Sequence, residues 1–142
     1  MFSKEQSKHM RQQFWIGFGK KYPRKWLLYN TKIKDLSLKF SFSTKQAQVS
    51  IDIEHTDELL RAYYFDKLVS LQSLLIESCG EDFTFEENYS LENGKVISRI
   101  YATKEKVSIH NPNTWEDTMA FFNQYMAQLE DFFITYKDYI DS

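Results

Sequence analysis

The 142-residue sequence has one cysteine, two prolines and four glycines, and each shortage excludes a class of structure. With Cys79 alone, the chain can form neither an internal disulfide nor a multi-cysteine zinc site, which favours a reducing cytoplasm. An average chain of this length has about 10 Gly and 7 Pro. Turn residues are therefore sparse, and we expect long helices and strands between them.

Long hydrophobic runs are also missing. Apolar runs such as 74–76 and 132–134 are far shorter than the ~20 residues of a membrane-spanning helix, and the first residues lack the apolar run of a secretory signal. In contrast, 42% of the residues are hydrophobic, and 3 Trp, 9 Tyr and 12 Phe are present. We therefore expect a cytoplasmic protein with no membrane contact and a single domain over 1–142. Its core should be large enough to need no metal or disulfide.

Hydrophobic periodicity predicts three helices. Apolar residues at four-residue spacing predict a helix from 4 to about 22, ended by Pro23. A second should begin at Thr56 or Asp57 and stop at Gly80. The third runs from 115 to 140, with apolar residues recurring at spacings of three and four.

Alternation of apolar and polar residues predicts the strands. Segments 36–42 and 48–54 should form a hairpin, and 83–85 should pair with 96–103 around a turn at Gly94. Shorter strands are expected at 26–29 and 107–109. The predicted fold is α+β, a largely antiparallel sheet of five or six strands packed on one face by three helices, in the order α-β-β-β-α-β-β-β-α. The other face of the sheet should be partly exposed to solvent.

The polar face of the first hairpin holds a group of charged residues. Asp52 and Glu54 project from the same side of one strand, Lys39 from the polar side of the preceding strand, and Asp35 precedes it. This arrangement resembles a Mg²⁺-dependent nuclease of the Asp/Glu-x-Lys type, in which carboxylates hold the metal and activate a water molecule. Glu54, however, stands where that motif has its lysine. A solvated face with cross-strand pairs and no cofactor is the alternative.

Two further groups are candidate binding residues. Asp57 and Arg61 are spaced for an ion pair at a helix start, with His55 at the preceding corner, either held by one hydrogen bond or acting as a base. Arg99, with Tyr101 on the same strand face, could grip an anion or pair with a carboxylate of the neighbouring strand.

Charge is unevenly distributed along the chain. Residues 1–45 contain eleven Lys and Arg and two acids, a net charge of +9, whereas 46–142 carry −11. Cations interleaved with aromatics are typical of nucleic-acid binding, although the two parts could also neutralise each other. The candidate residues of this segment are Lys20, Lys21, Arg24, Lys25 and Trp26.

The last helix has more apolar width than one contact face requires. Phe121, Tyr125, Phe132 and Tyr139 flank its main hydrophobic seam. This surplus predicts a protein partner, with a second copy of the chain, and hence a homodimer, as the leading candidate.

Three ordered blocks of sequence support a resemblance. The segments RQQFWIGFG (11–19), IDIEHTDELLR (51–61) and ISRIY (97–101) together resemble the bacterial family catalogued as domain of unknown function 4268. Similar domains occur alone or behind a nuclease-like domain, which implies an accessory role near DNA processing or defence. The wide aromatic face of the last helix and the lack of a complete catalytic set lead us to expect a self-associating binding module without catalysis of its own. A divergent Mg²⁺-dependent nuclease is the alternative.

Overall fold

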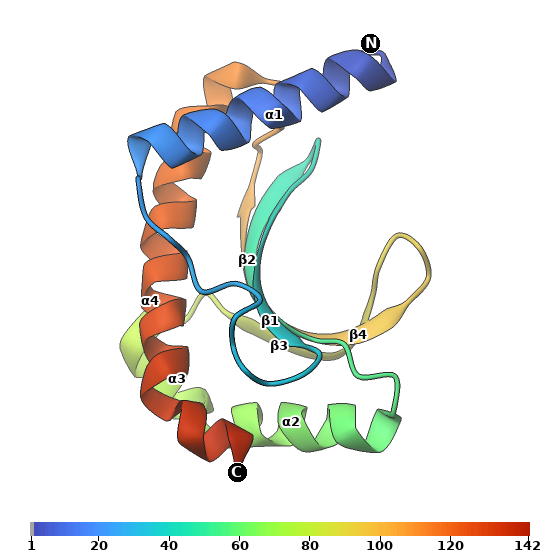
Figure 1. Cartoon of the computed structure of the whole chain (residues 1–142), viewed down its shortest axis with the longest axis vertical. Helices are drawn as coiled ribbons and strands as arrows, with labels where there is room; N and C mark the ends of the chain where they lie inside the picture. The colour runs from blue at the N-terminus through green and yellow to red at the C-terminus, as the bar shows by residue number, and fades with distance from the viewer. Residues whose placement is uncertain (1) are drawn as a thin grey trace.

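One antiparallel sheet organises the fold (Figure 1). The computed structural model describes residues 2–142. The strands follow the spatial order β1-β2-β4-β3, and every neighbouring pair is antiparallel. Their bounds are β1 Leu36–Phe42, β2 Gln46–Ile53, β3 Thr84–Ser90 and β4 Val96–Glu105.

Four α-helices and one short 3₁₀ turn complete the described part of the chain, so the α+β class is confirmed. The predicted counts of three helices and five or six strands are wrong, because residues 2–142 form four of each. The helices are α1 Lys4–Lys21, α2 Glu58–Ser70, α3 Gln72–Cys79 and α4 Trp115–Asp141, with the 3₁₀ turn η1 at Pro112–Thr114.

The extra helix arises because the predicted helix over 57–79 is interrupted at Leu71. At this residue the backbone leaves helical geometry, with φ −96° and ψ 7°, and its N–H donates to the carbonyls of Leu68 and Val69. The apolar spacing continues across the break, and Leu68, Leu71 and Leu75 are all buried. Hydrophobic periodicity alone therefore did not reveal the break between α2 and α3. Gly80 ends α3 at φ 89°, as predicted.

The two short predicted strands are wrong. Segment 26–29 belongs to a loop in which Leu28 has φ 45°, and the Trp26 ring stacks on Phe18 with centroids 6.4 Å apart. Segment 107–109 follows Lys106 at φ 62°, and its buried Val107 and Ile109 fill the core. In both segments the apolar side chains pack against helices and the edge of the core and do not form a strand ladder.

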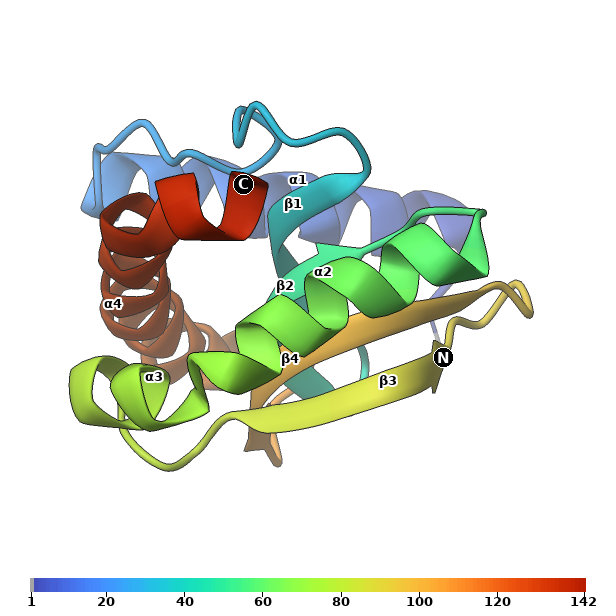
Figure 2. The same ribbon diagram turned by 90° about the horizontal axis from the view of Figure 1, so that it is seen from below.

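The helices cover one face of the sheet. Figures 1 and 2 show α2, α3 and α4 on the convex side of the curved sheet. Helix α1 joins them through Phe14 and Phe18, which pack against Phe40, Phe42 and Phe122. The same core receives the alternate residues of β2, Val49, Ile51 and Ile53, all 0% exposed. No helix packs along the concave side in either view.

Contacts within the chain use most of the apolar width of α4. Phe132 is 1% exposed, and Phe121 and Tyr125 pack against the core. Ile134 and Tyr139 remain exposed. The aromatic surplus therefore needs no partner to explain it, and the homodimer stays a prediction. None of the helices in residues 2–142 has both the length and the apolarity to cross a bilayer.

Candidate functional site

The concave face of the sheet carries a continuous set of polar side chains. Strand alternation places them together, because the register pairs Asp52 with Arg99, Ser50 with Tyr101 and Gln48 with Thr103. The bend of the sheet buries its centre, where Ser50 and Asp52 are 0% exposed. We call concave face the residues Lys39, Ser41, Gln48, Ser50, Asp52, Glu86, Tyr89, Arg99, Tyr101 and Thr103.

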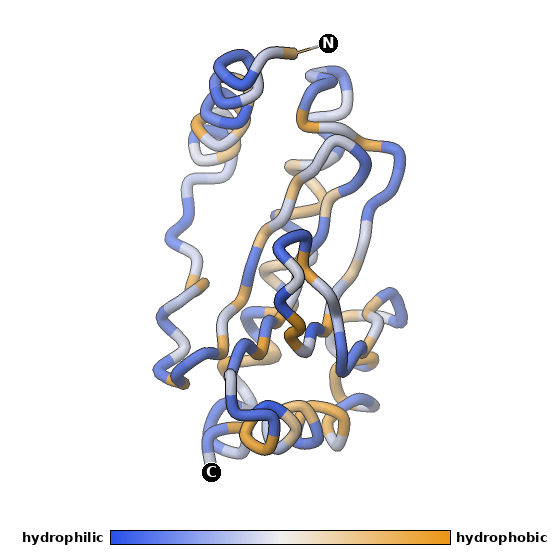
Figure 3. Tube along the Cα trace, turned by 90° about the vertical axis from the view of Figure 1, so that its right-hand side faces the viewer, coloured by the Kyte–Doolittle hydropathy of each residue, from blue (hydrophilic) through white to orange (hydrophobic). Residues whose placement is uncertain are grey.

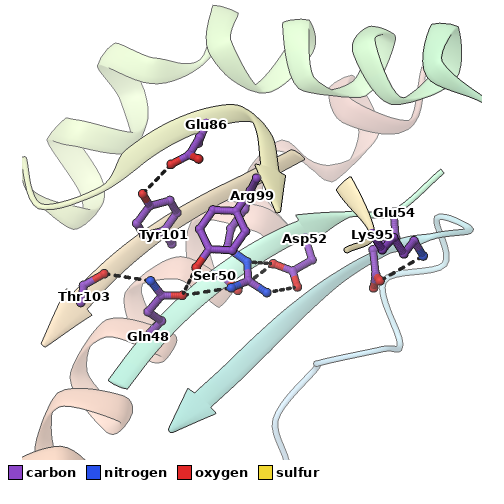
Figure 4. Close-up of polar contacts among 10 residues, drawn as sticks. Gln48, Ser50, Asp52, Glu54, Glu86, Lys95, Arg99, Tyr101 and Thr103 are labelled. Carbon is purple, nitrogen blue, oxygen red and sulfur yellow. Dashed lines mark hydrogen bonds and ion pairs between the residues drawn. The ribbon is translucent and has the colours of Figure 1, made fainter. Parts of the chain in front are cut away.

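A buried ion pair forms the centre of the concave face (Figure 4). Arg99 donates from Nε to Oδ1 and from Nη2 to Oδ2 of Asp52, both at 2.8 Å. Ser50 donates to the same Oδ1 at 2.8 Å, and Arg99 Nη1 donates to Gln48 Oε1 at 3.0 Å. Burial lowers the pKa of Arg99, but the hydrogen bonds and charge of Asp52 outweigh it, so this pKa lies above its usual value. Of the alternatives for Arg99, pairing with Asp52 is the one found.

Aromatic rings cover this ion pair. The guanidinium carbon of Arg99 lies 4.5 Å from the centroid of the Tyr89 ring, and the Tyr101 ring meets Tyr89 edge-on at 5.3 Å. Tyr101 donates to Glu86 at 2.8 Å. Burial, together with the bond and charge of Glu86, raises the pKa of Tyr101 to about 12. Both rings are therefore held in fixed positions.

A pocket of about 400 Å³ opens on the concave face. We call it the concave pocket. Arg99 and Gln48 line it from the two central strands. The rest of its wall comes from the β1–β2 hairpin and the end of β3 with its turn, namely Lys39, Ser41, Ser43, Gln46, Tyr89, Ser90, Leu91 and Glu92.

The predicted metal ligands divide into two places. Asp52 is occupied by Arg99. Asp35 and Glu54 lie side by side, since the Glu54 N–H donates to the Asp35 carbonyl at 2.7 Å and both residues line a pocket of about 250 Å³. Glu54 also pairs with Lys95 at 3.5 Å. Within residues 2–142 no three acidic, histidine or cysteine side chains form a group suited to a metal ion. The three residues therefore do not meet at one predicted Mg²⁺ centre, and only Asp35 and Glu54 are neighbours.

The predicted ion pair between Asp57 and Arg61 is not formed. Asp57 instead caps α2, accepting from Leu59 N at 2.9 Å and Leu60 N at 3.4 Å. Arg61 is buried and turns toward the sheet, where it donates to the Glu87 carbonyl at 2.7 Å and to Ser98 Oγ at 3.0 Å. Arg61 therefore anchors the irregular part of β3, a role that its sequence spacing did not reveal.

His55 lies at the corner between β2 and α2, as expected from its place in the sequence. Its ring is buried and stacks on Tyr64 with centroids 5.0 Å apart. Its Nδ1 makes no hydrogen bond within residues 2–142. His55 therefore fills the corner between β2 and α2 by packing on Tyr64.

The basic N-terminal third keeps most of its charge. Lys21 pairs with Glu116 at 3.1 Å, and Arg24 pairs with the nearly buried Glu130 at 2.8 Å while lying 4.3 Å from the Trp26 ring. The other nine cations of residues 1–45 form no ion pair within the described part of the chain. Lys20 and Lys25 are exposed. Local neutralisation by the acidic remainder is therefore limited to two residues.

The sheet order separates the charges in space. Figure 2 shows β1 and β3 at opposite edges, with the segment 22–35 beside β1. In Figure 3 the trace of α1 and of the segment descending from it is mostly hydrophilic. We call basic edge the cations Arg24, Lys25, Lys32, Lys34, Lys39 and Lys45, and acidic edge the residues Glu81, Asp82, Glu86 and Glu87.

Sequence reasoning did not identify Tyr89 as a site residue. The register of β3 against β4 shifts between Glu86 and Tyr89, so simple alternation places Tyr89 on the wrong face. The polar run Glu86-Glu87-Asn88 within an otherwise aromatic strand was the available signal.

Comparison with known proteins gives one family. A family model described as a domain of unknown function, DUF4268, matches residues 10–137. The comparisons with curated proteins and with solved structures give no match.

Proposed function

The chain belongs to the DUF4268 family, and we propose that it is a nucleic-acid-binding accessory domain without catalysis of its own. The observation that carries the proposal is the basic edge, in which every cation except Arg24 forms no ion pair within residues 2–142. Phosphates are neutralised by unpaired Lys and Arg, which release condensed counterions on binding. An accessory role in DNA processing or defence would follow from such binding.

The charge separation also gives the domain an orientation. The acidic edge repels a polyanion, whereas the basic edge attracts it, so one side of the molecule would face the nucleic acid. The Arg24 guanidinium lies against Trp26, which adds an aromatic surface to the cations. Both features support a specific docking side over diffuse attraction, because the overall charge of the chain is only −2.

Binding can be tested by fluorescence anisotropy with labelled single- and double-stranded oligonucleotides at increasing salt. We expect affinity to fall steeply with salt. The variant Lys25→Gln/Lys34→Gln removes two exposed cations of the basic edge and should lower the slope of log K against log salt by about 1.4 on a single strand. The control Lys104→Gln/Lys137→Gln makes the same change in net charge outside residues 1–45 and should leave the slope nearly unchanged. Salt-insensitive binding, or equal effects of the two variants, would count against the proposal.

A nuclease of the Asp/Glu-x-Lys type is the second candidate, supported by the adjacency of Asp35 and Glu54. Incubation of the same oligonucleotides with Mg²⁺ or Mn²⁺ tests it. Cleavage that disappears in Glu54→Gln would favour the nuclease over the binding module. If the oligonucleotides stay intact under all conditions, the nuclease hypothesis is wrong.

A further inference from the structure

The concave pocket has donor groups that the protein itself leaves unused. Lys39 is half-buried and forms no ion pair within residues 2–142. The Arg99 guanidinium has more N–H groups than its three bonds to Asp52 and Gln48 use. A pocket lined by an unpaired ammonium and a fixed guanidinium suits an anionic group such as a phosphate.

The pocket also has an aromatic platform. Tyr89 lines it and is half-buried, so part of its ring is accessible. The contacts of the Tyr89 ring with Arg99 and with the ring of Tyr101 hold it in place before any ligand arrives. A preorganised ring of this kind is suited to stacking on a nucleobase, whatever its sequence.

A carboxylate also lines the pocket. Glu92, in the turn after β3, lines the pocket but is not bonded to Arg99 or Lys39. This acceptor disfavours a bare polyphosphate and suits the exocyclic amine of a base. Phosphate donors, a stacking ring and an acceptor within about 400 Å³ match the chemistry of one nucleotide.

We propose that the concave pocket binds one unpaired nucleotide, so that the domain prefers single-stranded to double-stranded nucleic acid. The inference rests on the proposed function and adds a specificity to it. Lys39 belongs to both the basic edge and the pocket, so a strand held at the edge can pass directly into the pocket. A paired base cannot reach Tyr89, because its faces are buried in the stack of the duplex.

The test compares one single strand, its duplex and adenosine monophosphate on the wild type and on Tyr89→Leu. We expect the wild type to prefer the single strand, and adenosine monophosphate to displace it. Tyr89→Leu should weaken single-strand binding about tenfold or more and leave duplex binding unchanged. Tyr89→Phe keeps the ring and should retain the preference, which separates the stacking role from a folding defect. Lys25→Gln/Lys34→Gln should weaken both substrates alike.

The outcomes distinguish the two proposals. No oligonucleotide binding by the wild type would overturn the proposed function. If the wild type binds but Tyr89→Leu affects single strand and duplex equally, or neither, the pocket inference is overturned while the basic edge stands. Binding of adenosine monophosphate without any oligonucleotide binding would overturn the proposed function and leave the pocket as a mononucleotide site.

Discussion

At the scale of single residues, the molecule depends on one ion pair that is almost entirely buried. The side chains of Asp52 and Arg99 are 0% and 5% exposed, and their bonds to Ser50 and Gln48 satisfy much of their remaining hydrogen-bonding capacity. A buried pair of this kind contributes little net stability compared with apolar residues, because both charges lose their hydration. It instead fixes the position of Arg99, and through Arg99 the position of the Tyr89 ring.

Removing one partner of the pair should be costly. Asp52→Asn leaves the Arg99 charge buried without its counterion, and we expect the free energy of unfolding to fall by about 3–5 kcal/mol. The double variant Asp52→Leu/Arg99→Met removes both charges and should be less destabilised than Asp52→Asn. Urea unfolding followed by circular dichroism measures both. Unchanged stability in Asp52→Asn would mean that Asp52 is free for other chemistry, which would favour the nuclease.

Pairing of Asp52 with Arg99 was one of the options open from the sequence, since the two residues have opposite charges on polar strand faces. Tyr89 was not, because its face depends on a register shift that alternation does not encode. The site could thus be predicted where strands are regular and not where one strand is bulged.

At the scale of elements, local signals mark where helices begin. Ser3 and Gln6 form a capping box at the start of α1, with both hydrogen bonds present. Asp57 caps α2 through two backbone N–H groups. These short-range interactions involve residues within three positions of each other and can therefore be read from the sequence.

The cap at Asp57 can be separated from an ion pair by two substitutions. Asp57→Ala removes the acceptor for Leu59 N and Leu60 N and should lower the free energy of unfolding by about 1 kcal/mol. Asp57→Asn keeps an acceptor but removes the charge, and should retain most of the stability. The measurement is urea unfolding. If Asn and Ala were equally destabilising, a charge interaction with Arg61 would be the better explanation.

The helix break at Leu71 and the absence of strands at 26–29 and 107–109 could not be predicted from the sequence, because both depend on tertiary packing. The break at Leu71 has no proline or glycine beside it, and the apolar spacing continues through it. Segments 26–29 and 107–109 contain strand-forming residues, but Leu28 and Lys106 adopt positive φ and turn the chain away from the sheet. The apolar composition of these two segments predicted that they are buried, but it could not predict which elements they pack against.

At the scale of the whole molecule, three acidic groups from different elements resist ionisation. Burial, followed by the charge of Asp131, raises the pKa of Cys79 from 9.0 to about 11. The pKa of Tyr101 rises from 10.0 to about 12, through burial and Glu86. The hydrogen bond to Asp82, with burial, also raises the pKa of Tyr125. Each group keeps its proton in the folded chain at a pH where the unfolded chain has lost it.

Stability should therefore decline at alkaline pH. Above pH 9.0, the unfolded value of Cys79, the folded state binds more protons than the unfolded state, so the free energy of unfolding falls as pH rises toward 12. Well below pH 9.0 these groups are protonated in both states and contribute no slope. Thermal unfolding between pH 8 and 11 measures the effect, and Cys79→Ala should reduce the earliest part of the decline. A constant melting temperature to pH 11 would contradict these shifts.

The two sheet edges have a consequence for aggregation. An open sheet can add further strands from other molecules wherever backbone groups at its edge are unpaired. Here β1 is shielded by the segment 22–35, whose Leu28 carbonyl accepts from Leu38 N. The opposite edge, β3, has a register shift between Glu86 and Tyr89 and carries like charges that repel a second copy. The protein can therefore leave one whole sheet face uncovered without presenting two unprotected strand edges to other molecules.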